Sequence, residues 1–335
     1  MSLVIGAAGA VGKRLIGALA ARGDNVVAAM RSTPLPDHLQ TAVQRQVMNV
    51  DQGNIEALRK IFKRHPEIHT VWNMQVVRAR AADAEATVGG MKNILQVMQE
   101  YDVNKMIFAD SVASFPKSAP KKDCPARWLQ ENPKEEPVAE IGNQKRECRA
   151  LLKSFSEEGG DGRYAVIPSV LHIEAAWGAG LTSYPLDAMR AAIDGLPYVC
   201  PVDKDKAMPM IYVDDLVRGL LDLADAPQNM LYEPCRGYAL PGFSMTPAQL
   251  FAQIQRTIPE FDYAVEINPE KNELALSWPD TLSMQEAARD LGYRPAFGVE
   301  ETVQRILRAY TARRQPRAVG AEMSSIGEPA FNMGQ

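Results

Sequence analysis

The chain has 335 residues, of which 46% are hydrophobic and 23% are charged, a composition typical of a folded globular protein. Its 37 Lys and Arg residues against 41 Asp and Glu residues give a formal net charge of −4, so the chain as a whole lacks the basic excess of a nucleic-acid-binding protein. No apolar run approaches the roughly 18 residues of a membrane-spanning helix. We therefore expect one large or two modest domains, and neither nucleic acid nor a membrane as a partner.

The four cysteines lie far apart in the sequence and form no Cys-x-x-Cys pair. This spacing excludes a zinc ribbon and argues against a disulfide framework, so a reducing compartment is the simplest interpretation. The first residues enter an apolar run directly, without the charged region that opens a secretory signal peptide. We expect a cytoplasmic location, with an organelle matrix as the alternative if a targeting segment has been removed.

Short β-branched runs alternate with longer amphipathic stretches in the first third of the chain. The expected strands are residues 3–5, 26–30, 43–50, 70–73 and 105–109. The expected helices between and after them are residues 13–22, 54–64 and 81–101. This alternation predicts an α/β fold with a Rossmann-like, doubly wound parallel sheet and helices on both faces.

The pattern changes after residue 110. Residues 114–137 contain five prolines and many charges, which predicts a long loop. Further on we expect a strand at 164–167 and helices at 140–157, 186–193, 247–258, 284–291 and 299–313. We expect a dinucleotide-binding domain over 1–170 with sheet contributions from 208–225, a smaller C-terminal substrate lobe over 171–314, and a tail over 315–335.

A glycine-rich loop follows the first expected strand and opens the first expected helix. Gly6 suits a tight turn, Gly9 lets the backbone approach a pyrophosphate, and Gly12 allows close packing of helix on strand. The N–H groups at the helix start, including those of Ala10 and Val11, then face the phosphates. The alternative is a glycine-rich turn with no ligand.

The end of the second strand indicates which dinucleotide binds. An NAD site usually has an acidic residue there for the ribose 2′-hydroxyl. This chain has Arg31 and Ser32, a cation and a hydroxyl suited to a 2′-phosphate, so NADP(H) is favoured and NAD(H) remains possible. The alternative for Arg31 is a solvated loop charge. Asn49 and Val50, after the third strand, meet the adenine edge or simply form a turn.

Several motifs together resemble a known family. The glycine loop, Ser111 after the fifth strand and Lys145 in the next helix are similar to the extended short-chain dehydrogenase/reductase superfamily, which includes NAD-dependent epimerases and dehydratases. Segments 208–215, 243–248, 258–261 and 277–279 resemble its branch of short-chain-type L-threonine 3-dehydrogenases. The resemblance runs from residue 3 to about residue 311.

The resemblance implies a Tyr-x-x-x-Lys helix and an upstream Ser or Thr as catalytic groups. The tyrosine acts as general acid/base, and the lysine lowers its pKa and holds the nicotinamide ribose. Ser111 and Lys145 fall on the serine and lysine positions, but the tyrosine position is Ile141, which has no proton to exchange. The family's Arg-Tyr-Pro-Gly run is also changed here, to Val-Ile-Pro-Ser at residues 166–169.

Other groups are candidates for the missing role. Tyr184 and His172 are predicted catalytic residues, because Tyr184 lies in a segment similar to the family's substrate side and His172 titrates near neutral pH. Lys145 itself would serve as a base if its amine were desolvated. Cys148 and Asp110 lie near Lys145 and Ser111; for Cys148 a small buried apolar residue is the simpler interpretation.

The substrate pocket is expected in the C-terminal lobe. Thr182, Ser183, Tyr184 and Trp278 are the predicted substrate-binding residues, with packing between lobes as the alternative for Trp278. A pair of carboxylates, Asp214-Asp215, invites a metal site, but we assign it to capping of the following helix and predict no metal.

Three functions are compatible with these residues. We expect an atypical NAD(P)-dependent oxidoreductase acting on a small hydroxy or keto substrate, of which an amino-acid-like molecule is one candidate. The alternatives are a non-redox lyase, isomerase or cyclase on the same scaffold, and a non-catalytic dinucleotide-binding protein. The resemblance implies a homodimer that pairs through helices 81–101 and 140–157.

Overall fold

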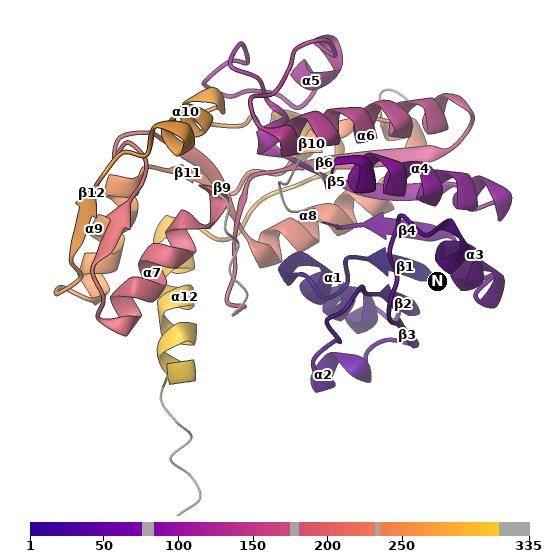
Figure 1. Cartoon of the computed structure of the whole chain (residues 1–335), viewed down its shortest axis with the longest axis horizontal. Coiled ribbons are helices and arrows are strands. Elements are labelled where there is room, and N and C mark those ends of the chain that lie inside the picture. Colours follow the sequence, from indigo (N-terminus) through magenta and orange to yellow (C-terminus); the bar gives the residue numbers. More distant parts are fainter. Residues whose placement is uncertain (76–83, 175–180, 232–234, 315–335) are drawn as a thin grey trace, which may run out of the picture.

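The computed structural model of the chain describes residues 1–75, 84–174, 181–231 and 235–314. A central sheet lies between two layers of helices, and a smaller lobe from the second half of the chain adjoins it (Figure 1). The predicted fold class, a Rossmann-like doubly wound parallel sheet with a smaller C-terminal lobe, is confirmed. The predicted tail, 315–335, and the first residues of the predicted helix 81–101 lie outside the described residues.

Seven parallel strands form the central sheet in the order β10-β6-β5-β4-β1-β2-β3. The strands are β1 (Ser2–Ile5), β2 (Val26–Ala29), β3 (Arg45–Val47), β4 (Thr70–Asn73), β5 (Lys105–Ser111), β6 (Asp161–Ile167) and β10 (Gly237–Ala239). Ile5, the last residue of β1, pairs with Ala29 of β2 on one side and Asn73 of β4 on the other. The strand order reverses at β1, and ligands of such sheets bind at the carboxyl ends of the strands at that point.

Helices cover both faces of the sheet (Figure 1). One layer holds α3 (Ile55–Arg64), α4 (Ala84–Glu100) and α6 (Glu140–Glu157), and the other holds α1 (Ala10–Ala21), α2 (Asp37–Gln40) and α8 (Val213–Asp225). Each layer packs on its own hydrophobic cluster, exemplified by Leu58 and Met91 on the first side and Leu15 and Leu220 on the second. None of the helices in the described ranges is long and apolar enough to cross a membrane.

Local signals explain where individual helices begin. The Asn54 side chain accepts a hydrogen bond of 3.2 Å from the Ala57 N–H at the start of α3, and Leu58, Ile61 and Phe62 then recur at helical spacing and are buried. Caps of this kind satisfy N–H groups that lack a partner within the helix. The prediction of helix 54–64 rested on its amphipathic pattern, and the helix is confirmed.

The C-terminal lobe contains two small sheets and five helices among the described residues. The strands are β7 (Ser169–Leu171), β9 (Met208–Tyr212) and β11 (Phe243–Met245) in one sheet, and β8 (Tyr198–Cys200) and β12 (Tyr263–Val265) in the other. The helices are α7 (Tyr184–Asp194), α9 (Pro247–Thr257), α10 (Pro269–Ser277), α11 (Gln285–Asp290) and α12 (Val299–Arg314). The segment 208–225 therefore gives the first domain its helix α8, but its strand belongs to the three-stranded sheet, and the seventh strand of the central sheet is β10.

The predicted loop 114–137 links the two parts of the molecule. It follows the short 3₁₀ helix Val112–Ser114 and includes one short helix, α5 (Trp128–Glu131). From this loop the Lys121 ammonium donates to the carbonyl oxygens of Leu276 at 2.8 Å and Ser277 at 3.0 Å, at the end of α10. The cation faces the negative end of the helix dipole, so the loop is fastened to the C-terminal lobe.

The carboxylates of Asp214 and Asp215 do not cap α8. The prediction that they bind the first N–H groups of this helix was therefore wrong. The N-cap of α8 is Tyr212, and no side chain caps the helix. The buried Asp215 accepts hydrogen bonds of 2.9 Å from the backbone N–H groups of Ala296 and Phe297. Asp214 pairs with Arg14 of α1 at 2.6 Å. Both carboxylates join distant segments, and the described residues contain no cluster of three potential metal ligands.

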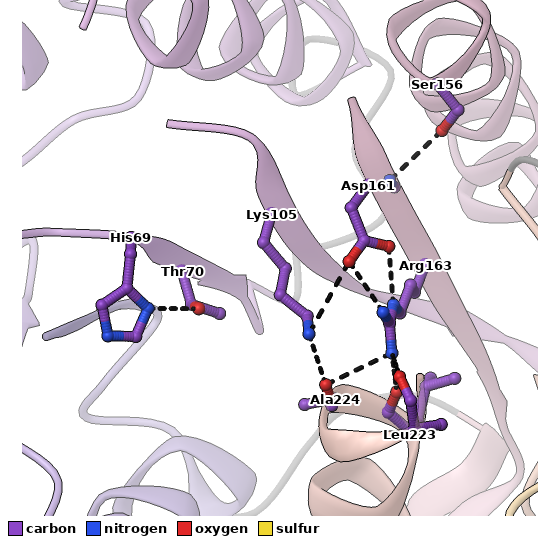
Figure 2. A network of polar contacts seen from close by, with 10 residues as sticks. His69, Thr70, Lys105, Ser156, Asp161, Arg163, Leu223 and Ala224 are labelled. Carbon is purple, nitrogen blue, oxygen red and sulfur yellow. Dashed lines mark hydrogen bonds and ion pairs between the residues drawn. The ribbon is translucent and has the colours of Figure 1, made fainter. Parts of the chain in front are cut away.

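A second polar network lies at the amino ends of β5 and β6 (Figure 2). Arg163 makes two hydrogen bonds of 2.7 Å to the Asp161 carboxylate. Its guanidinium also donates to the carbonyl oxygens of Leu223 at 2.6 Å and Ala226 at 2.7 Å. Lys105 reaches the Ala224 carbonyl oxygen at 2.5 Å. Together these cations cap the carboxyl end of α8 and fasten the helix to the sheet.

Candidate functional site

The glycine loop, residues 6–12, connects β1 to α1 through a backbone path that requires glycine. Gly6 has a φ of +83°, and a Cβ at that position would come within 2.9 Å of the Met74 backbone. A Cβ on Gly12 would lie 2.3 Å from the Gly6 carbonyl oxygen. Larger residues are excluded at both positions, so the loop stays close to the sheet edge and exposes its backbone to a ligand.

The first turn of α1 faces the same space. The helix has Gly9 as its N-cap, and no side chain caps it. The N–H groups of Ala10, Val11 and Gly12 belong to the first turn, where helix geometry provides no acceptor. The helix dipole adds positive potential there. This combination is the one that binds phosphate groups in dinucleotide-binding folds, so the residues present fit a pyrophosphate.

The predicted nucleotide-selecting residues lie together at the ends of β2 and β3. Arg31 and Ser32 are exposed. The Asn49 N–H donates to the Arg31 carbonyl oxygen at 3.1 Å, and the Val50 N–H donates to the Met30 carbonyl oxygen at 2.9 Å. Asn49 has a φ of 59°, which supports its turn interpretation. The turn holds Arg31 at the rim of the sheet edge that carries the glycine loop.

Ser111 is placed at the same edge by β5. It is the last residue of the strand and the N-cap of the 3₁₀ helix that follows. Its Oγ accepts a hydrogen bond of 3.2 Å from the Ala113 N–H. This bond uses an oxygen lone pair, so the hydroxyl of the half-buried Ser111 retains its own proton for a ligand.

Lys145 extends from α6 to the ends of β4 and β5. Its Nζ donates to the carbonyl oxygens of Ala109 at 2.5 Å and Gln75 at 3.4 Å, and it lies 4.6 Å from the centroid of the Phe108 ring. The side chain is 4% exposed. Burial lowers the pKa of this ammonium from its ordinary value. Lys145 is therefore a fixed group of the site and not a solvated surface lysine.

Ile141 precedes Lys145 by one helical turn and packs, half-buried, against the hydrophobic core. The next residue, Gly142, brings α6 against the turn after Ser111, because a Cβ there would lie 2.1 Å from the Ala113 carbonyl oxygen. The amino end of α6 is thus in direct contact with the Ser111 turn. An apolar side chain stands at the point where the resemblance implies a tyrosine.

Tyr184, a predicted catalytic and substrate-binding residue, lies in the C-terminal lobe at the start of α7. It is 3% exposed, and no described group hydrogen-bonds to its hydroxyl. Burial, followed by the nearby Cys200 and Tyr198, raises the pKa of this phenol well above its ordinary value. Both of these neighbours belong to the lobe, and the hydroxyl stays protonated at neutral pH.

The other predicted substrate-side residues also lie in the lobe. Thr182 and Ser183 form a 3₁₀ turn before α7, and the Ser183 hydroxyl donates to Asp187 at 3.0 Å. Trp278 ends α10 and is 3% exposed, and no described group accepts a hydrogen bond from its indole N–H. Its carbonyl oxygen accepts a hydrogen bond of 3.0 Å from the Lys206 ammonium. The Trp278 side chain is part of the larger hydrophobic cluster.

His172 lies at the junction of the two parts of the molecule. Its Nδ1 accepts a hydrogen bond of 3.2 Å from the Glu174 N–H, and its carbonyl oxygen accepts one of 3.1 Å from the Tyr310 hydroxyl. Glu174 in turn pairs with Lys13 of α1 at 2.5 Å. Burial lowers the pKa of the His172 imidazole, which favours the neutral ring.

The structure thus brings some predicted residues together and separates others. The glycine loop, Lys145 and Ser111 meet at one sheet edge, and Gln75 joins them: its backbone N would lie 3.0 Å from a Cβ on Gly6, and its carbonyl oxygen binds Lys145. The contacts of Tyr184, Trp278 and His172 lie elsewhere, in the C-terminal lobe and at its junction with the rest of the molecule. Sequence reasoning missed Gln75, which acts through its backbone and is marked only by its position after β4.

Comparison with known proteins agrees with this geometry. Residues 2–233 match the NAD dependent epimerase/dehydratase family. An uncharacterised epimerase/dehydratase of Staphylococcus haemolyticus is 26% identical over 93% of this chain and 98% of its own length. The mitochondrial L-threonine 3-dehydrogenase of Bos taurus is 24% identical over 72% of this chain and 61% of its own length. The solved structure of a GalE-like L-threonine dehydrogenase from Cupriavidus necator, in its holo form, has a TM-score of 0.82 at 26% identity and covers 92% of this chain and 98% of that one.

These comparisons confirm the resemblance stated for the sequence. The matched region includes the glycine loop, Ser111 and Lys145, the residues that the fold places at one edge of the sheet. The family name itself states a dependence on NAD, so a nicotinamide dinucleotide is the cofactor that the match implies. The chain belongs to the NAD dependent epimerase/dehydratase family, a family of enzymes within the extended short-chain dehydrogenases/reductases.

Proposed function

We propose that the chain is an oxidoreductase that binds NADP(H), with its pyrophosphate at the start of α1, and acts on a small hydroxy or keto substrate. The glycine loop carries this proposal, because Gly6 and Gly12 are in conformations and contacts that exclude any side chain while the first turn of α1 has no side-chain cap. A turn without a ligand has no need of both features. An amino-acid-like substrate is favoured by the similarity to L-threonine 3-dehydrogenases.

The choice of NADP over NAD rests on Arg31 and Ser32. Both are exposed at the end of β2, where NAD-binding members of such folds carry an acidic residue. Replacing Arg31 with Ala is expected to weaken NADP⁺ binding about tenfold, because one charge-assisted hydrogen bond is lost. Binding of NAD⁺, which has no 2′-phosphate, is expected to stay unchanged. Calorimetric titration of both nucleotides into both proteins makes this comparison, and equal affinities of the variant and the parent for NADP⁺ would contradict it.

At the reacting end, Ser111 and Lys145 have separate tasks. The Ser111 hydroxyl retains a proton with which to hold the oxygen of a hydroxy or keto substrate. The Lys145 ammonium, which donates to the Ala109 carbonyl oxygen, would hold ribose hydroxyls. The nicotinamide, when bound, supplies the hydride acceptor or donor. Thr182, Ser183, Tyr184 and Trp278 would then line the substrate side, and His172 and Tyr184 stay candidates for moving the substrate's proton.

Ile141 favours a second candidate function. An isoleucine at the position of the family's general acid/base removes the group that moves a proton during hydride transfer. A non-redox lyase, isomerase or cyclase, or a non-catalytic dinucleotide-binding protein, would need no such group. Incubation with NADP⁺ and a panel of small hydroxy acids separates the candidates. Formation of absorbance at 340 nm supports the oxidoreductase. Substrate conversion without that signal supports a non-redox enzyme, and nucleotide binding with no conversion supports a non-catalytic dinucleotide-binding protein.

The remaining expectations concern assembly and compartment. We propose a homodimer that pairs through α4 and α6, as the resemblance implies, and a cytoplasmic location. We also propose the division into a dinucleotide-binding domain over 1–170 and a substrate lobe over 171–314. Sedimentation analysis tests the dimer, and a mass of 36.9 kDa at all concentrations would contradict it.

A further inference from the structure

A buried ion pair lies directly behind the candidate site. Arg149 of α6 and Asp110 of β5 are 2.6 Å apart, and their side chains are 9% and 0% exposed. Asp110 immediately precedes Ser111, and Arg149 follows Lys145 by one helical turn. Successive residues of a strand point to opposite faces, so the Asp110 side chain faces α6 and the next side chain, Ser111, points to the other face.

The Asp110 carboxylate organises the turn that carries Ser111. Besides Arg149, it accepts a hydrogen bond of 2.8 Å from the Ser111 N–H and one of 2.6 Å from the Ser114 hydroxyl. Both ends of the 3₁₀ turn are therefore bound to one carboxylate. The Ser111 Oγ also accepts a hydrogen bond of 3.2 Å from the Ala113 N–H. The orientation of the Ser111 hydroxyl depends on this carboxylate through the backbone.

The other partner fixes the helix that carries Lys145. Residues four apart share one face of a helix, so Lys145 and Arg149 face β5 together. Lys145 binds the carbonyl oxygen of Ala109 and Arg149 binds the side chain of Asp110, which are consecutive residues of the strand. These two contacts set how far along β5 the helix lies, and hence how far Lys145 is from Ser111.

Stability alone is a weak reason for such a pair. Removing two charges from water costs about as much as their attraction returns, and apolar residues of similar size often stabilise a core equally well. Buried ion pairs are best attested where they fix one alignment of two elements. Here the two aligned elements are the strand and the helix that hold Ser111 and Lys145.

We propose that Asp110, together with Arg149, is a positioning residue that sets the geometry of Ser111 and Lys145. The functional role of this positioning rests on the proposed function, whereas the contacts of Asp110 and Arg149 do not depend on it. The proposal assigns Asp110 no contact with substrate or cofactor. It also implies that the charge of Asp110 influences the proton on Lys145.

The charges around Lys145 make this implication measurable. Burial lowers the pKa of the Lys145 ammonium, whereas Cys148 on α6 and Asp110 on β5 act in the opposite direction. Loss of the Asp110 charge, with Arg149 still present, should lower the pKa of Lys145 further. Loss of the Arg149 charge leaves Asp110 without its closest cation and should raise it. Opposite shifts from two partners of one ion pair are an electrostatic signature that damage to the fold does not produce.

The experiment measures Lys145 in the full chain without any ligand. Trace acetylation with acetic anhydride over a series of pH values, read by mass spectrometry of the peptide containing Lys145, gives the midpoint at which the amine becomes reactive. We expect a lower midpoint in Asp110→Asn, a higher one in Arg149→Gln, and an unchanged one in Arg149→Lys, which keeps the charge. Midpoints that move in the same direction in both of the first two variants, or do not move, would overturn the proposal.

NADP⁺ titration adds the functional readout. We expect its dissociation constant to rise about tenfold in Asp110→Asn and in Arg149→Gln, the effect of one misplaced charge-assisted hydrogen bond, and to recover in Arg149→Lys. The double variant Asp110→Asn/Arg149→Gln leaves no unpaired charge and should fold even if a single variant does not. A folded double variant with the parental affinity would overturn the proposal.

A matched control comes from the opposite edge of the sheet. Arg163→Gln breaks another ion pair, with the partly buried Asp161, at the amino end of β6 and beside α8 instead of α6. It should leave the acetylation midpoint of Lys145 and the NADP⁺ affinity unchanged, and shifts equal to those of the Asp110 variant would overturn the proposal. If the parent protein binds no NADP⁺ at all, the proposed function fails, and the acetylation midpoints still decide the present inference.

Discussion

The two edges of the central sheet, at the amino and the carboxyl ends of its strands, use the same types of residue for different purposes. At the amino ends of β5 and β6, Lys105 and Arg163 are bound to Asp161 and to backbone carbonyls of α8 (Figure 2). At the carboxyl end of β5, Lys145 and Ser111 stand beside a glycine loop that leaves backbone exposed. The first edge uses charge to fasten a helix, and the second holds polar groups ready for a ligand. This contrast predicts that changes at one edge affect stability and changes at the other affect binding.

The largest effect is expected at the amino edge. Arg163 is 2% exposed, and its replacement by Ala would leave the Asp161 carboxylate and the carboxyl end of α8 with Lys105 as their remaining cation. Breaking a buried pair in this way costs about 3–5 kcal/mol of the free energy of unfolding. Urea denaturation measures the loss. Lys153→Ala, which breaks an exposed pair with Glu157, is the control and should leave the denaturation midpoint in place.

The next largest effect is expected at the glycine loop. Gly12→Ala would place a Cβ 2.3 Å from the Gly6 carbonyl oxygen and push the loop from its path. We expect NADP⁺ affinity to fall at least about 100-fold through several lost hydrogen bonds, with a stability loss of about 1–3 kcal/mol from overpacking.

The matched control for Gly12 is Gly89→Ala in α4. A Cβ at Gly89 meets no atom within 4 Å. This variant should keep the parental affinity and gain up to about 1 kcal/mol of stability, because Ala favours the helix more than Gly does. Equal nucleotide affinities for the Gly12 and Gly89 variants would remove the functional distinction between the two sheet edges.

A smaller effect is expected from pH at the junction of the two parts. Burial lowers the pKa of His172 in the folded state below its ordinary value of 6.5. Below pH 6.5 the unfolded chain therefore binds more protons than the folded chain, so stability falls as the pH falls, by no more than about 1.4 kcal/mol per pH unit for this group. Urea denaturation between pH 7 and about pH 5 should show a shallower loss in His172→Gln. The exposed His38→Gln serves as the control, and a slope unchanged by His172→Gln would contradict this account.

The smallest effect is expected from restoring the family's tyrosine alone. Ile141→Tyr would place a phenol on the same face as Lys145, but the end of β2 and residues 166–169 also differ from threonine dehydrogenases. We expect the rate of NAD-dependent threonine oxidation to rise, relative to the parent protein, by much less than the roughly 100-fold that a positioned general acid/base supplies. Robust threonine turnover by this variant would show that the proton donor is the only catalytic part that the chain lacks.

The sequence predicted those parts of the molecule that depend on local pattern. The alternating strands and helices of the first half and the glycine loop follow from periodicity and spacing, and the residues that the loop needs are adjacent in sequence. β10 was not predicted as part of the central sheet, because three residues, Gly237–Ala239, carry no periodic signal. The partner of Asp215 was missed for another reason: its N–H donors at Ala296 and Phe297 are some 80 positions away.

Only some residues of the candidate site could be identified from the sequence. Ser111 and Lys145 were predicted because the resemblance assigns them to the family's serine and lysine positions, and the structure brings both to the carboxyl end of β5. Tyr184 and Trp278 could not, since their surroundings depend on how the lobe packs. The partners of the Asp110 carboxylate lie on its own turn and on α6, and nothing in the local pattern distinguishes such a carboxylate from a solvated one.

The most direct test of the central claim is calorimetric titration of NADP⁺ and NAD⁺ into the full chain. We predict saturable binding at one site per chain, tighter for NADP⁺ than for NAD⁺, and its loss in Gly12→Ala while Gly89→Ala binds normally. Folded protein that binds neither nucleotide would contradict it, and would mean that the glycine loop serves another ligand or none.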